Sequence, residues 1–165
     1  MKERIDVFDY SEHIMKALRK GILLNTNGDK FNSMVISWGH FGVIWGEPTF
    51  VVYVREHRYT KAQLDKTREF TLSIPLDKPD PLIHKVCGSL SGRDTDKVSE
   101  AKLTLAAPEK NNTPAVAEYP LTLSEGEYFV LADYRNGGAD SRFFGAVKED
   151  EILGTVITIL RRNNL

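Results

Sequence analysis

The chain has 165 residues, of which 41% are hydrophobic and 27% are charged, and this balance suits one globular domain with an apolar core. Its formal net charge of −1 gives no electrostatic reason to expect nucleic acid or an anionic membrane as a partner. The charged N-terminus leads into no long apolar run, and the single cysteine, Cys87, allows no disulfide within the chain. We therefore expect a single domain over residues 1–165, without a signal peptide or membrane span, in a reducing cytoplasm.

The sequence also lacks the motifs of several common enzyme classes. None of the four histidines lies in a Cys/His cluster with zinc-ligand spacing, so no metal site is expected. No two glycines are separated by a single residue, which excludes the Gly-x-Gly fingerprint of a dinucleotide-binding fold. The Gly-x-Ser-x-Gly elbow of a serine hydrolase is absent too.

In chain order, residues 11–19 read as an amphipathic helix that ends before Gly21. Residues 22–26 and 31–37 read as antiparallel strands joined by an Asn-Gly turn. A flexible stretch over 39–42 and a crossover at 43–48 should follow, with Pro48 opening a strand at 49–54. Five or more antiparallel strands and few helices favour a closed or partly closed barrel.

The second half begins with a helix over 59–67, capped at or near Thr60, and a strand over 69–74. A short helix over 81–87 precedes a polar loop at 87–97, and Asp94 or Thr95 should cap another short helix through residue 101. Residues 102–120 read as irregular. The last expected strands cover 127–134, 141–147 and 155–160.

Two strand ends carry the residues that point to function. The first ends at Ser37 and Trp38, and the second is followed by Arg-x-x-Arg-Tyr-Thr, residues 55–60. Arginine offers forked charged donors, threonine a hydroxyl, and the first turn of a helix free N–H groups, which together suit a phosphate. We therefore expect a phosphorylated, aromatic cofactor to bind where these strands end.

Some of these residues also have a plainer interpretation. Trp45 should pack in the core or at a dimer contact, whereas Trp38, beside Ser37 and a glycine, should lie near the ligand. Cys87 should be a small buried residue rather than a nucleophile. The loop at 87–97 is either only a connection or a cover whose Arg93 and Lys97 approach a bound anion.

At these residues the sequence resembles the flavin reductase-like, FMN-binding split-barrel family, especially its flavoredoxin-like branch. The matching segments are Lys20-Gly21-Ile22-Leu23-Leu24, Asn32-Ser33-Met34-x-Ile36-Ser37-Trp38-Gly39, Val54-Arg55-x-x-Arg58-Tyr59-Thr60, Glu69-Phe70-Thr71 and the loop from Cys87 to Lys97. The likeness is strong over residues 11–105. Two departures are Val35, where the family often has threonine, and Arg142, where it usually has a histidine before Phe-x-Gly.

The resemblance implies a mainly β fold, a Greek-key antiparallel split barrel with a few short peripheral helices, which forms a homodimer with FMN near the subunit interface. Together with the residue types on the first strand, it gives ten expected cofactor-binding residues. Those along the isoalloxazine and ribityl chain are Asn32, Met34, Ser37 and Trp38, and the strand-borne hydroxyl of Ser33 is a further expected partner of the flat ring. Those at the phosphate are Arg55, Arg58, Tyr59 and Thr60, and Lys97 reaches the flavin from the polar loop.

The function that follows is an FMN-binding oxidoreductase, for which FAD is a possible substitute. It would take electrons or hydride from NADH or NADPH, bound transiently, or from a protein donor, and pass them to a flavin, a small acceptor or a partner protein. Because the flavin itself accepts hydride or electrons, no catalytic residue is assigned. The alternatives are a non-enzymatic electron carrier or flavin store, and a split barrel that binds another ligand.

Overall fold

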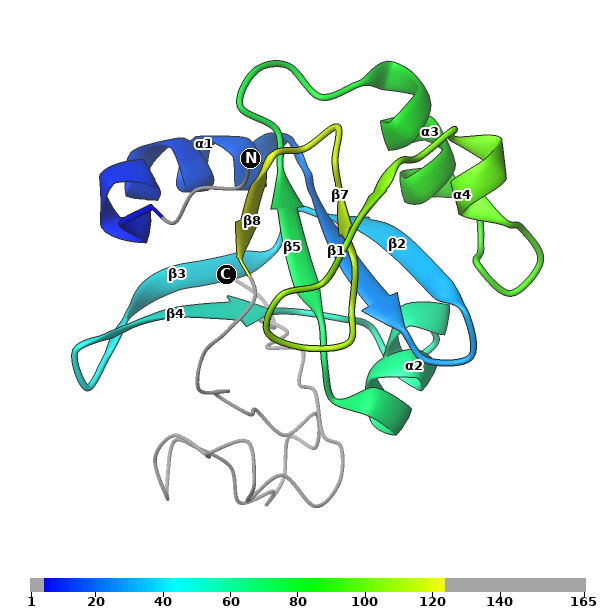
Figure 1. The fold of residues 1–165 in the computed structure, drawn as a ribbon, viewed down its shortest axis with the longest axis horizontal. Coiled ribbons are helices and arrows are strands. Elements are labelled where there is room, and N and C mark those ends of the chain that lie inside the picture. The colour runs from blue at the N-terminus through cyan, green and yellow to red at the C-terminus, as the bar shows by residue number, and fades with distance from the viewer. Residues whose placement is uncertain (1–4, 124–165) are drawn as a thin grey trace, which may run out of the picture.

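The computed structural model describes residues 5–123, which form a mainly β fold with short helices around it (Figure 1). A four-stranded antiparallel sheet has the order β2-β1-β5-β8. Its strands are β1 (Ile22–Asn27), β2 (Phe31–Ile36), β5 (Thr71–Ile74) and β8 (Leu121–Leu123). Two ribbons complete the strands, β3 (Gly39–Ile44) with β4 (Glu47–Val52), and β6 (Leu105–Ala106) with β7 (Ala115–Val116). The helices are η1 (Val7–Tyr10), α1 (Ser11–Lys20), α2 (Tyr59–Thr67), α3 (Pro81–Ser89) and α4 (Lys97–Glu100).

Strand β1 is the centre of the fold, because both of its faces are covered. Alternate residues of a strand point to opposite faces, so Ile22 and Leu24 enter one apolar cluster while Leu23 enters another. The first cluster is completed by α1 and α2, and the second by α3 and β7. The register pairs Ile22 with Ile36 and continues to the predicted turn, so the β1–β2 hairpin is confirmed.

The prediction was wrong for residues 39–48, which form the β3–β4 hairpin rather than a flexible stretch and a crossover. The hairpin turns at Trp45 and Gly46, whose φ angles are +49° and +88°, as a two-residue turn of this kind requires. Strand β4 accordingly ends at Val52, two residues before the predicted end. Trp45 is 73% exposed in this chain, so core packing is also wrong for that residue.

Helix α2 covers the predicted residues, but its start differs from the expectation. Arg58 occupies the N-cap position and no side chain caps the helix there. The hydroxyl of Thr60 instead contacts the sulfur of Met34 and accepts a hydrogen bond from Asn32. The predicted cap at Thr60 is therefore wrong, because that side chain is used inside the protein to join α2 to β2.

The remaining helices follow the prediction with small changes. Helix α1 extends to Lys20, and α3 extends to Ser89 with Asp80 as its N-cap. Asp96, rather than Asp94 or Thr95, caps α4 by accepting a hydrogen bond from the Val98 amide. Among residues 5–123, no helix has the length and apolar composition that crossing a bilayer requires.

Two further differences concern strands. Strand β5 begins at Thr71 rather than residue 69, and all four of its residues are buried because both faces are covered. The stretch over 102–120, expected to be irregular, contains β6 and β7. The strands expected at 127–134, 141–147 and 155–160, and the departure at Arg142, lie outside the described residues.

Candidate functional site

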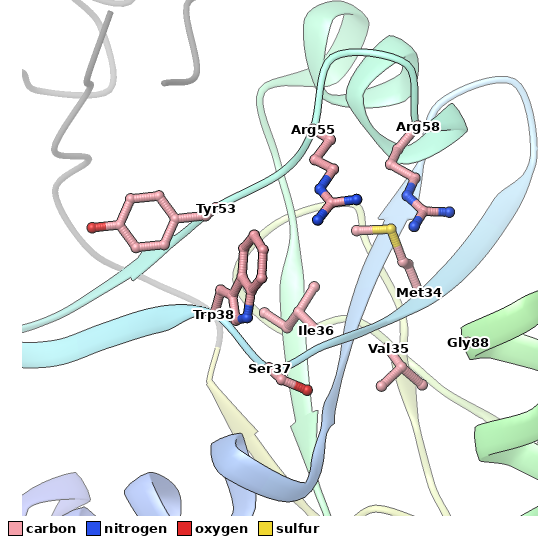
Figure 2. Close-up of a pocket in the computed structure, with 9 residues that line it drawn as sticks. All are labelled: Met34, Val35, Ile36, Ser37, Trp38, Tyr53, Arg55, Arg58 and Gly88. Atoms are coloured by element: carbon pink, nitrogen blue, oxygen red, sulfur yellow. The ribbon is translucent and has the colours of Figure 1, made fainter. Parts of the chain in front are cut away.

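A cavity of about 220 Å³ opens where the end of β2 meets the link between β4 and α2 (Figure 2). The backbone amide of Tyr53 donates to the carbonyl oxygen of Trp38 at 3.3 Å, and this bond holds the two connections side by side. The lining residues are Met34, Val35, Ile36, Ser37, Trp38, Tyr53, Arg55, Arg58 and Gly88. The cavity is therefore built from the two strand ends that the sequence singled out.

Five of the ten predicted site residues line this cavity: Met34, Ser37, Trp38, Arg55 and Arg58. Figure 2 shows both guanidinium groups directed from the β4–α2 link toward Met34. The guanidinium carbon of Arg55 lies 5.0 Å from the ring centroid of Trp38, close enough for a cation–π contact. Trp38 is 55% exposed, so its ring forms an accessible side of the cavity.

The two arginines make this end of the cavity suitable for an anion. Both are exposed, and neither forms an ion pair with a carboxylate from residues 5–123. Helix α2 begins immediately after Arg58, and the first N–H groups of a helix have no partner within the helix. Two forked cations beside a helix start provide the donors that a phosphate group accepts from.

Three other predicted residues lie behind the cavity wall rather than on it: Asn32, Ser33 and Thr60, all buried. The side-chain amide of Asn32 donates to the Thr60 hydroxyl at 3.0 Å, and that hydroxyl lies 3.6 Å from the sulfur of Met34. These contacts support Met34 and the start of α2 from inside the protein. Tyr59 is half-buried, with Lys30 and Arg93 within 6 Å of its ring centroid.

Lys97, the last predicted residue, is only 4% exposed and does not line the cavity. Its ammonium group donates to the carbonyl oxygens of Ser33 at 2.8 Å and Cys87 at 3.3 Å, which ties β2 to α3. Burial lowers the pKa of Lys97, the Cys87 thiol opposes that effect, and the charge of Arg58 adds to it. The amine of Lys97 is therefore a buried structural donor behind the cavity wall, not a contact on it.

The expectation that Cys87 is a small buried residue is confirmed, since the thiol is 1% exposed. Burial raises the pKa of this thiol, against the opposing influence of Lys97 and the Ser33 side chain. A protonated, inaccessible thiol is a poor nucleophile.

Sequence reasoning missed four residues that line the cavity: Val35 and Ile36 of β2, Tyr53 and Gly88. The position of Tyr53 could have been predicted from the sequence, because in an extended chain residues two apart point to the same side, and Tyr53 lies two residues before Arg55. Its hydroxyl is 2.7 Å from His40 Nδ1, and burial raises the pKa of Tyr53. Gly88 had no independent signal. A Cβ there would lie 3.6 Å from the nearest atom of Val35, so a larger side chain would narrow the cavity.

The fold matches flavin proteins of known structure. Flavoredoxin of Desulfovibrio vulgaris (Miyazaki F) is 24% identical with a TM-score of 0.59, and the match covers 68% of this chain and 60% of that protein. Flavoredoxin from Methanosarcina acetivorans is 25% identical with a TM-score of 0.53, covering 63% and 54%. An FMN-binding domain of a flavin reductase-like enzyme from Shewanella baltica OS155 is 18% identical with a TM-score of 0.52, covering 67% and 60%.

The described residues therefore have the flavin reductase-like, split-barrel fold, as the resemblance implied. The match spans less than two thirds of the length of each of these three proteins. A comparison with curated proteins gave no match.

A second finding comes from the sequence itself. Residues 50–160 match a family described as signal peptidase, peptidase S26. This match covers more than half of the chain, and by that measure the chain belongs to the signal peptidase S26 family. The matched segment contains α2, β5 and α3 of the fold described above. For residues 50–123 of this match, the fold is assigned from the structure itself. Residues 124–160 of the match lie outside the described residues.

Proposed function

We propose that this chain binds FMN and acts as a flavin-dependent oxidoreductase of the flavin reductase or flavoredoxin type. The observation that carries the proposal is the pair of arginines, Arg55 and Arg58, directed into a cavity that Trp38 and β2 also line. A dianionic phosphate at one end and a flat apolar ring at the other would match these two surfaces. The flavin named with one structural neighbour is FMN, which supports the same choice.

The cavity of this chain is large enough for the phosphate end of FMN but not for the whole cofactor. Small-molecule sites commonly enclose about 300–1,000 Å³, whereas this cavity measures about 220 Å³. We therefore infer that the cavity takes the phosphate and ribityl end, and that the ring extends past Trp38. FMN ends in a phosphate monoester, which places its charge of about −2 on one terminal group. The pyrophosphate of FAD divides a similar charge between two phosphates that lead on to an adenosine, so two arginines at one end of the cavity favour FMN.

In this proposal the flavin supplies hydride or electron transfer, and the protein supplies binding and electrostatics. Arg55 and Arg58 hold the phosphate, Met34 and Trp38 cover apolar surface, and Asn32 with Thr60 supports the wall from behind. The charge of Arg58 favours negative charge on a bound ligand. A nicotinamide donor, NADH or NADPH, or a redox protein would approach from the exposed side of Trp38, and no catalytic residue is assigned.

We also propose a cytoplasmic homodimer. The β3–β4 hairpin presents apolar side chains, including Val43 at 58% exposure and Trp45 at 73%, and such a surface favours contact with a second copy. FMN near that contact would obtain the enclosure that the cavity of one chain lacks.

Replacing both Arg55 and Arg58 with alanine should weaken FMN binding by about 10²–10⁴-fold, because each charged hydrogen-bonding group contributes ~1.5–3 kcal/mol. The dissociation constant can be measured by quenching of flavin fluorescence. Riboflavin, which lacks the phosphate, should bind the variant and the unaltered protein equally. Replacing Arg19 and Lys20 with alanine, both exposed in the last turn of α1, removes the same number of charges and is the matched control. An unchanged FMN affinity in the double variant would refute the phosphate assignment.

Turnover separates the enzyme from a carrier or flavin store. We expect NADH or NADPH to bleach the flavin absorption band of the loaded protein, and an added acceptor to restore it over many cycles. A carrier would instead be reduced slowly or only by a protein donor. A protein that takes up no FMN at all would favour a split barrel with a different ligand.

We further propose that residues 1–165 form one domain. The alternative, raised by a family match that continues to residue 160, is two units that meet near residue 123. Limited proteolysis of the full chain tests this: one domain should yield no early, stable fragment ending close to residue 123, whereas two linked units should yield one.

The family match favours a second candidate function, cleavage of signal peptides. Within the described part of the chain, Cys87 and Lys97 pair a thiol with an amine, but both are buried and burial raises the pKa of the thiol. No group of three possible metal ligands occurs there either. This pair is therefore unsuited to peptide cleavage, and incubating the full chain with a precursor that carries a signal peptide tests the second candidate function. Cleavage that survives Cys87→Ala, which removes the nucleophile, would exclude the Cys87–Lys97 pair as its site.

A further inference from the structure

A short turn over residues 91–95 packs against the outside of the β4–α2 link. The turn is closed by its own hydrogen bonds, since the amides of Asp94 and Thr95 both donate to the carbonyl oxygen of Ser91. The Arg93 amide also donates to the Ser91 hydroxyl at 3.2 Å. These bonds fix the turn between α3 and α4, so it presents the Arg93 side chain from a defined position.

Arg93 contacts the link on both sides of Arg58. Its guanidinium Nη1 donates to the carbonyl oxygen of His57 at 3.1 Å, and its guanidinium carbon lies 5.7 Å from the ring centroid of Tyr59. Arg93 does not line the cavity, so it touches the arginines only through the backbone and ring beside them. The link has one backbone bond of its own, from the Arg58 amide to the Arg55 carbonyl oxygen at 3.0 Å.

Gly92 shows that this close approach requires a glycine. A Cβ at Gly92 would lie 2.1 Å from Asn32 Oδ1 and 2.8 Å from Cδ1 of Tyr59, and both distances are too short for any side chain. Asn32 belongs to the buried contacts that join β2 to α2. The turn therefore rests against both components of the proposed phosphate site, the strand and the helix start.

We infer that Arg93 is a positioning residue that holds the Arg55–Tyr59 link in the shape that aims Arg55 and Arg58 at one phosphate. The inference rests on the proposed FMN site and concerns its selectivity for a phosphorylated flavin. Two guanidinium groups three residues apart repel one another, and residues 55–58 are all exposed, so the link needs an external contact to keep them convergent. Arg93 supplies that contact at the carbonyl between them.

The test compares FMN with riboflavin on Arg93 variants of the full chain. Arg93→Ala should raise the dissociation constant for FMN about tenfold, the usual effect of losing a charged hydrogen bond, and leave that for riboflavin unchanged. Arg93→Met keeps a long side chain over Tyr59 but cannot donate to His57, so it should behave like Arg93→Ala and is expected to fold. Lys85→Ala, an exposed change of equal charge on α3, is the control.

The outcomes separate this inference from the proposed function. If Arg93→Met binds FMN as tightly as the unaltered protein while the Arg55/Arg58 double variant does not, the positioning role is refuted and the FMN site stands. Equal weakening of FMN and riboflavin would refute the selectivity for phosphate. Equal weakening by Lys85→Ala would assign the effect to general charge. If the unaltered protein binds no FMN, the proposed function fails and this inference fails with it.

Discussion

The hydrogen bond between the side chains of Asn32 and Thr60 connects the sheet to the helix that opens at the candidate site. Both residues are buried, so the bond is shielded from water and fixes where α2 starts relative to β2. Everything in the cavity depends on that placement. Met34 lies two residues after Asn32, and Arg58 lies two residues before Thr60. A shift of β2 or of α2 would therefore move the arginines away from the cavity wall that they face.

The site combines the last residues of β2, Met34 to Ile36, with side chains from the surrounding connections and from α3. Trp38 follows β2, the two arginines follow β4, and Gly88 lies near the end of α3. Strand β1, covered on both faces, supplies the rigid part of the molecule. Placing ligand contacts on links that leave a rigid sheet is common, because links tolerate changes of side chain that a packed strand does not.

Sequence reasoning succeeded where the signals were local. The β1–β2 hairpin follows from an Asn-Gly turn between apolar runs, and α2 was predicted at its observed bounds. It failed at β3, because two glycines and a histidine read as flexible, although the strand is paired along its whole length with β4. The cap of α2 was misjudged because a threonine near a helix start usually caps it, whereas Thr60 is engaged with Asn32.

For the site, the residue types at two strand ends were sufficient to bring together Met34, Ser37, Trp38, Arg55 and Arg58. The residue types were not sufficient to distinguish residues that line the cavity from residues that are buried behind it. Asn32, Ser33 and Thr60 share these segments but are buried, and Lys97 reaches β2 from α4; only the packing of α2, α3 and α4 on β2 decides this. The match of residues 50–160 to the signal peptidase S26 family is a sequence relationship that is not apparent in the fold of residues 5–123.

The two tryptophans occupy contrasting surroundings, one beside a guanidinium at the cavity and the other at the tip of the β3–β4 hairpin. An indole exposed to solvent and an indole beside a guanidinium differ in fluorescence emission, so the two tryptophans report on different parts of the molecule. The fluorescence of Trp45 would respond to contacts between the β3–β4 hairpin and other molecules, and the fluorescence of Trp38 would respond to a ligand in the cavity.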